Sequence, residues 1–146
     1  MVSLLPERQD LVRTHPASLH KNVPGVKFLP YEERLVKLGL WTLKERRNRA
    51  DLVEVFKLVK GLVNNPFDIF FEKSTNSHLR GHSWKLNKSR CHMDLRKYFF
   101  SVRVVDRWNK LPQEAIDSTS VDVFKSRLQR IRDAQMSFFT DVPAFY

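Results

Sequence analysis

The sequence has a single cysteine, Cys91, so an internal disulfide bond is excluded. One thiol in 146 residues is typical of a reducing compartment, and we expect an intracellular protein, nuclear or cytoplasmic. No apolar run approaches the roughly 18 residues of a membrane-spanning helix, so we expect no membrane partner. The opening residues, MVSLLPERQD, include early acids and no long apolar core, and they do not predict a secretory signal.

Acidic residues are scarce between Ser74 and Lys110. The whole sequence has 26 Lys and Arg against 16 Asp and Glu, a formal net charge of +10. Between Ser74 and Lys110 there are nine Lys and Arg, but the only acids are Asp94 and Asp106. A positive field concentrated in this way attracts polyanions. We therefore expect RNA or DNA as the partner, bound without sequence preference.

The chain shows no internal repeat and no low-complexity tract, and its length favours one domain. Proline and glycine interrupt residues 1–27, for which we predict an irregular N-terminal arm that is dispensable for folding. A basic helical domain is predicted over residues 28–136. An irregular tail is predicted over residues 137–146.

The hydrophobic pattern predicts a mainly α fold with about three substantial helices. A short helix over residues 31–38 is expected to end at Gly39. Thr42 and Glu45 have the spacing of a capping box, which predicts the start of a long helix that continues to about Leu62. The apolar face expected for this helix consists of Leu52, Val55, Phe56, Val59 and Leu62.

Two further long helices are predicted. Ser120 is expected to cap the last one, whose apolar stripe consists of Val121, Phe124, Leu128 and Ile131. The other is predicted to run from Met93 to Lys110. At 100° per residue, its apolar side would carry Leu95, Tyr98, Val102, Val105 and Trp108. The opposite side would carry a basic stripe of Arg96, Arg103, Arg107 and Lys110.

Shorter elements are expected between the long helices. One helical turn is predicted over residues 67–71. Apolar and polar residues alternate along residues 82–87, which predicts a short extended or hairpin segment near 80–88, followed by a turn at 87–89. Trp108 in the following helix is expected to lie in the core. Trp84 in the extended segment is expected either to lie in the core, which we favour, or to contact a base or sugar.

Four segments together resemble one known protein region. They are LPYEERLVKLGLWTLKERRNRADLVEVFKLVKG from Leu29, RGHSWKL from Arg80, RCHMDLRKYFFSVRVVDRWNKLP from Arg90 and SVDVFKSRLQRI from Ser120. Their order and spacing are similar to the C-terminal, thumb and post-polymerase region of reverse transcriptases from non-LTR (LINE-type) retrotransposons of the chicken-repeat and jockey-like group. The resemblance implies contact with a template–primer duplex or with the element's RNA.

The resemblance does not imply catalysis. The polymerase centre of that family holds two metal ions with an aromatic-Ala-Asp-Asp motif and an upstream Asp, and this chain contains no Asp-Asp pair. We therefore expect a non-enzymatic, nucleic-acid-binding fragment of an RNA-directed DNA polymerase. One alternative is a protein-interaction module that binds an acidic partner. The other is a decayed element remnant with no selected function.

The basic middle of the chain supplies the candidate binding residues. Arginines along one helix face can neutralise successive phosphates, and Phe100, which lies near the stripe, can either stack on a base or pack under a neighbour. The candidate nucleic-acid-binding residues are Arg80, Lys85, Lys88, Arg90, Arg96, Lys97, Phe100, Arg103, Arg107 and Lys110.

Metal binding and nucleophilic catalysis are weaker hypotheses. Zinc-capable side chains are supplied by His78, His82, Cys91 and His92. Adjacent Cys91 and His92 rarely point at one ion, and histidine in a basic segment is more simply a polyanion contact. A Cys91–His92 nucleophile would also need an orienting group and a pocket, which no pattern here indicates. We expect no catalytic residue, no metal and no cofactor.

Overall fold

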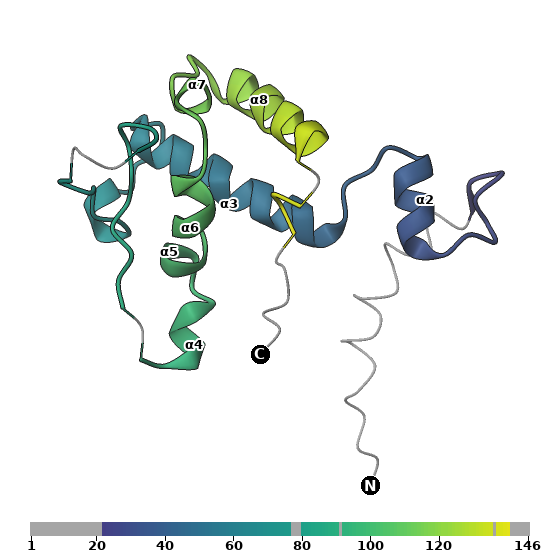
Figure 1. Cartoon of the computed structure of the whole chain (residues 1–146), viewed down its shortest axis with the longest axis horizontal. Coiled ribbons are helices and arrows are strands. Elements are labelled where there is room, and N and C mark those ends of the chain that lie inside the picture. Colours follow the sequence, from purple (N-terminus) through teal and green to yellow (C-terminus); the bar gives the residue numbers. More distant parts are fainter. Residues whose placement is uncertain (1–21, 77–79, 91, 136, 141–146) are drawn as a thin grey trace, which may run out of the picture. The chain divides into compact units, whose positions relative to one another are not determined.

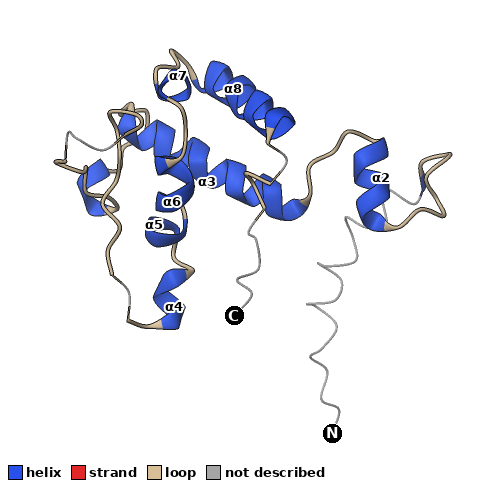
Figure 2. Cartoon of the chain, in the orientation of Figure 1, coloured by secondary structure: helices blue, strands red, loops and turns tan. Residues whose placement is uncertain are grey.

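The computed structural model describes residues 22–76, 80–90, 92–135 and 137–140, and in these ranges the chain is helix and loop (Figures 1 and 2). This confirms the mainly α fold. The chain divides into two compact units, Met1–Thr42 and Leu43–Tyr146. The division therefore falls after Thr42, later along the chain than residue 28, where we expected the helical domain to start.

The N-terminal unit contains one described α-helix, α2 (Tyr31–Lys37). It ends as predicted at Gly39, whose φ of +62° is the left-handed conformation that glycine favours after a helix. The Leu40 amide donates to the Leu35 carbonyl (2.9 Å), which closes this C-terminal cap. Residues 1–21 of the predicted arm lie outside the described residues, but Val26 at its end is buried.

Helix α3 (Leu43–Val59) crosses the second unit and contacts both α6 (Val105–Asn109) and α8 (Val121–Ala134) (Figure 1). It ends in the predicted glycine cap, where Gly61 has a φ of +67° and the Leu62 amide donates to the Lys57 carbonyl (2.9 Å). The predicted apolar face is buried at Leu52, Val55 and Phe56. Leu62 is exposed instead, because the backbone has already left the helix at Gly61.

Aromatic side chains join these helices in the core. Phe56 of α3 stacks on Phe124 of α8, with ring centroids 4.3 Å apart and an interplanar angle of 11°. Trp108 of α6 packs against the same Phe124 ring at 6.3 Å and is fully buried, which confirms its expected place in the core. The Ser120 hydroxyl accepts a hydrogen bond from the Val123 amide (3.3 Å), which confirms the predicted cap of α8.

The predicted long helix over Met93–Lys110 is wrong. The structure has three short helices there, α4 (Asp94–Lys97), α5 (Phe100–Arg103) and α6. Phe99 adopts an extended conformation (φ −67°, ψ 144°) at the start of α5, and its carbonyl accepts from the Val102 and Arg103 amides. The aromatic and β-branched residues around these breaks lose side-chain freedom in a helix, which lowers their helix propensity.

The breaks also change which side chains reach the core. Val102, Val105 and Trp108 are buried as predicted. Leu95 and Tyr98 were predicted to share that face, but they are 80% and 72% exposed because α4 does not continue the axis of α5. The basic residues predicted as one stripe are consequently divided among different elements.

An extended segment forms where the sequence predicted one. Lys73 and Leu86 make an antiparallel β-bridge, in which the Ser74 amide donates to the Lys85 carbonyl and the Asn87 amide to the Glu72 carbonyl (both 2.8 Å). The predicted turn at 87–89 is absent, and the chain there is irregular loop. The helical turn predicted at 67–71 is present as η2 (Phe67–Ile69). A last short helix, α7 (Gln113–Ile116), precedes α8.

In the described part of the chain, no helix combines the length and the apolar character that crossing a membrane requires.

We expect Trp108→Ala to lower the free energy of unfolding by about 3–5 kcal/mol, because it leaves a cavity beneath Phe124 and removes an indole hydrogen bond. Chemical denaturation followed by circular dichroism measures this loss. Leu95→Ala is the control and is expected to change stability by less than about 0.5 kcal/mol, since Leu95 is exposed. Similar losses for both variants would contradict the placement of Trp108.

Candidate nucleic-acid interface

The extended segment is fixed to α6 by side chains that bond its backbone. Asn109 donates its amide to the Leu86 carbonyl and accepts from the Leu86 amide, each at 2.9 Å, as a neighbouring strand would. The Trp108 indole donates to the Trp84 carbonyl (2.7 Å). These bonds satisfy backbone groups that would otherwise be left without partners near the core. They also hold the cationic segment between Arg80 and Arg90 beside α6.

His82 adds a further link between the two segments. Its Nδ1 accepts from the Trp84 amide (3.1 Å), so the ring hydrogen lies on Nε2, which donates to the Trp108 carbonyl (2.9 Å). Burial lowers the pKa of His82 below its ordinary value of 6.5, and the nearby charge of Lys85 acts in the same direction. The hydrogen bond to Trp108 opposes this shift only in part. The structure therefore uses His82 as a neutral, doubly bonded ring.

Arg103 is held by the central helix. Its Nε and Nη2 atoms donate to the two carboxylate oxygens of Asp51 on α3, at 2.8 and 2.9 Å. Its third nitrogen, Nη1, donates to the Tyr98 carbonyl (2.9 Å). The hydrogen bond to Asp51 raises the pKa of Arg103 above its already high ordinary value. Arg103 is therefore a permanently charged group in a fixed position.

Two hollows adjoin one another at Arg103 and Asp106. The larger, of about 520 Å³, is lined by Arg103, Asp106, Arg107, Lys110, Gln135, Ser137, Phe138 and Thr140. The smaller, of about 350 Å³, is lined by Lys88, Ser89, Arg90, Lys97, Val102, Arg103 and Asp106. We call their cationic lining the basic surface, which consists of Lys88, Arg90, Lys97, Arg103, Arg107 and Lys110.

Among the described residues that line the two hollows, Asp106 is the one that carries a negative charge. Asp106 lies where the hollows meet, and its carboxylate pairs with Lys88. Both side chains of this pair are exposed, so the pair contributes little to stability. Arg90, Lys97 and Lys110 are exposed as well. The arrangement can thus present several cations to one extended polyanion.

The structure brings together six of the ten predicted binding residues, and it separates the other four from the two hollows. The Lys85 ammonium donates to the Arg80 carbonyl, and Arg96 is exposed on α4. Phe100 packs edge-to-face on Phe71 and Phe70, with centroids 5.5 and 6.3 Å apart. These ring contacts match the packed alternative for Phe100 rather than base stacking.

Sequence reasoning missed the polar lining near the C-terminus. Residues 137–140 were predicted as irregular tail, but they form a turn that completes the larger hollow. Arg107 Nε donates to the Phe138 carbonyl (3.0 Å), and the Asn48 amide on α3 donates to the Phe139 carbonyl (2.7 Å). Phe139 is fully buried. An apolar residue at this position was the feature of the sequence that could have predicted that residues 137–140 pack against the core.

The predicted zinc candidates are not assembled into a ligand set in the residues that can be described. His78 and Cys91 lie outside them, and both ring nitrogens of His82 bond the backbone. Within the described ranges, no three His, Cys, Asp or Glu side chains are placed to hold one metal ion.

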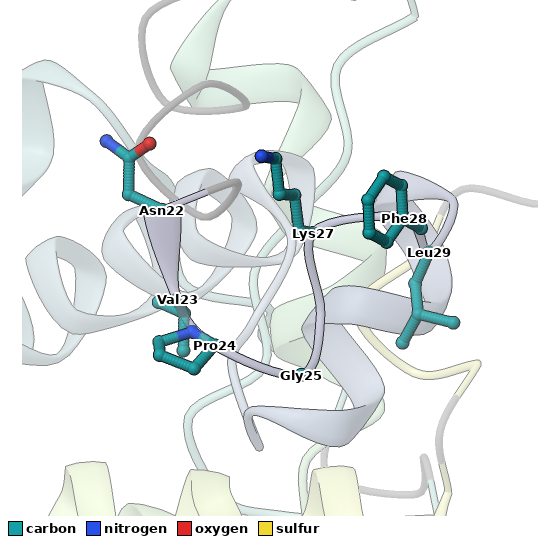
Figure 3. Close-up of a pocket in the computed structure, with 7 residues that line it drawn as sticks. All are labelled: Asn22, Val23, Pro24, Gly25, Lys27, Phe28 and Leu29. Carbon is teal, nitrogen blue, oxygen red and sulfur yellow. The ribbon is translucent and has the colours of Figure 1, made fainter.

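A separate hollow of about 530 Å³ lies in the N-terminal unit, between Asn22 and Leu29 (Figure 3). Of the described residues that line it, only Lys27 carries a charge, and its Nζ lies 5.7 Å from the exposed Phe28 ring. One cation among apolar residues and turn backbone does not make an anion-binding array, so the basic surface is the stronger candidate.

Comparison with known proteins does not identify the chain. No protein-family model, curated protein or solved structure matches it. The retrotransposon resemblance therefore stays a prediction, and the site is judged on its geometry.

We expect the free energy of unfolding to decrease as the pH is lowered, because His82 is buried as a neutral ring. Its folded-state pKa is lowered, so the unfolded chain binds the proton more tightly. The stability that neutral His82 contributes is complete above its ordinary pKa of 6.5. It is lost as the pH falls below 6.5 towards the folded-state pKa. Each unit between the two pKa values corresponds to about 1.4 kcal/mol. Denaturation at about pH 7.5 and about pH 5.5 measures the loss, which His82→Gln is expected to reduce. An unchanged pH dependence in that variant would contradict the assignment.

We expect Arg103→Gln to lower the free energy of unfolding by about 1–2 kcal/mol, since it leaves the Asp51 carboxylate without its fork-like partner. A fully buried pair would lose about 3–5 kcal/mol, but the Arg103 side chain is 39% exposed and is partly screened by solvent. The double variant Arg103→Gln/Asp51→Asn is expected to recover part of the loss. Lys110→Gln is the control in the same denaturation assay, and equal behaviour of Arg103→Gln and Lys110→Gln would argue against the pair.

Proposed function

We propose that this chain is a non-catalytic nucleic-acid-binding protein that contacts the phosphate backbone of RNA or DNA through the basic surface. The observation that carries the proposal is the convergence of six cations, from the extended segment and from α4 to α6, on two adjoining hollows whose described lining residues include one acid. Phosphates spaced along a strand need several cations at intervals, whereas a small anion needs only a few convergent donors.

The chemistry of the lining fits backbone contact. Exposed lysines and arginines neutralise phosphates without reading sequence, because phosphate contacts carry no base information. Ser89, Ser137 and Thr140 add hydroxyl donors of the kind that also bond phosphate oxygens. The proposed binding is therefore independent of sequence and sensitive to salt.

The resemblance to reverse transcriptases of non-LTR retrotransposons supports the same proposal from a different direction. Two of the segments that carry it, Arg80–Leu86 and Arg90–Pro112, are bonded to each other through Trp108 and Asn109. We propose that the chain is a fragment derived from the C-terminal region of such an enzyme, and that it acts without polymerase activity of its own.

We expect Arg90→Gln/Lys97→Gln/Lys110→Gln to weaken binding to all nucleic-acid sequences alike. If all three cations meet phosphates, the slope of log affinity against log salt should shrink by about 2–3 units, since each contact releases about 0.7–0.9 counterion. Stability should be unchanged, because all three residues are exposed. Fluorescence anisotropy with labelled oligonucleotides over a salt series measures the slope.

The control is Arg46→Gln/Arg47→Gln/Arg130→Gln, which removes the same charge from exposed positions outside the two hollows. Equal slope losses in the two triple variants would mean diffuse attraction and would contradict a defined interface. Displacement of the oligonucleotide by polyglutamate at equal charge concentration would favour the acidic-protein alternative.

A further inference from the structure

Large apolar side chains are exposed next to the basic surface. Tyr98 and Phe99, in the break between α4 and α5, are 72% and 58% exposed. Met93 and Leu95, at and within the start of α4, are 73% and 80% exposed. Adjacent exposed apolar residues of this size mark a surface that a partner covers.

The two aromatic residues are tied to the centre of the basic surface. The Tyr98 carbonyl accepts from Arg103 Nη1 (2.9 Å), and the Phe99 carbonyl accepts from the Arg103 amide (2.9 Å). Lys97, which lines the smaller hollow, directly precedes Tyr98. The aromatic rings are therefore carried on backbone that is bonded to the residue at which the two hollows meet.

This combination points to the chemistry of the partner. A ligand that fits several spaced cations carries a series of negative charges. A ligand that also covers exposed aromatic rings carries flat or apolar groups along the same chain. An unpaired nucleic-acid strand presents both phosphates and open base faces, whereas a duplex stacks its base faces on one another. An acidic polypeptide supplies the charge but no repeated flat faces.

We propose that Tyr98 and Phe99 stack on unpaired bases while the basic surface holds the neighbouring phosphates, so that the ligand class is single-stranded nucleic acid. The inference rests on the proposed function and specifies which form of nucleic acid is bound. Stacking on aromatic rings tolerates every base, because each base has a π face, so the binding remains independent of sequence.

The test uses the full chain with three labelled probes of about 16 nucleotides: a single strand, its duplex, and an abasic strand with the same phosphates. The wild type is expected to bind the single strand more tightly than either other probe. Tyr98→Leu/Phe99→Leu keeps apolar bulk but removes the rings, and it should lose roughly tenfold or more on the single strand alone. Tyr98→Trp/Phe99→Trp should retain the preference. Both pairs lie at exposed positions, and thermal unfolding checks that the variants fold.

Met93→Ala/Leu95→Ala is the matched control, since it removes exposed apolar groups that have no ring. Its single-strand affinity is expected to stay within about twofold of the wild type.

Equal wild-type affinity for the single and abasic strands, or no effect of Tyr98→Leu/Phe99→Leu, would overturn the stacking inference and leave the proposed function in place. Binding to phosphatidylserine vesicles that depends on Met93 and Leu95, without single-strand preference, would overturn it in favour of a membrane surface. Absence of binding to all three probes would overturn the proposed function itself.

Discussion

A line of buried polar side chains on α3 determines how the second unit is assembled. Buried polar and charged groups are costly unless they are hydrogen-bonded. Each of these three α3 side chains forms a hydrogen bond with a different segment of the unit. The three side chains and their partners are Glu45 with Arg132 of α8 at 3.0 and 3.3 Å, Asn48 with the Phe139 carbonyl at 2.7 Å, and Asp51 with Arg103 of α5 at 2.8 and 2.9 Å. The basic surface depends on this line, because both its central arginine and its C-terminal turn are attached to it.

A second constraint acts on the other side of the basic surface. The extended segment has one β-bridge among the described residues, and four of its other backbone hydrogen bonds are made with side chains of α6 and α7. Gly81 allows this arrangement: its φ is +119°, and a Cβ there would lie 2.8 Å from Lys85 Cε. The backbone of the cationic segment is thereby positioned by hydrogen bonds to neutral side chains, and Lys88 and Arg90 within it are exposed.

Local rules account for the part of the fold that the sequence predicted. The ends of α2 and α3 follow from Gly39 and Gly61, and the start of α8 follows from Ser120. The pairs made by α3 could not be predicted in this way, since Asp51 and Arg103 are 52 residues apart and Glu45 and Arg132 are 87 apart. Glu45 has the pattern of helix-surface charge and is instead buried. Helical periodicity also ignores the breaks at residues 98–99 and 104, so it placed Arg96 on one stripe with Arg103, Arg107 and Lys110, whereas Arg96 lines neither hollow.

The pairing of Arg103 with Asp51 changes how much positive charge the basic surface presents to solvent. Asp51 cancels much of the Arg103 charge at a distance, and Asp106 offsets Lys88 in the same way. The long-range field therefore comes mainly from other exposed cations, such as Arg90 and Lys110. Arg103 contributes at close range, as a rigid group that fixes the Tyr98 and Phe99 backbone. Long-range charge and local positioning are thus divided between different residues, and a count of Lys and Arg overstates the net positive charge that the surface presents.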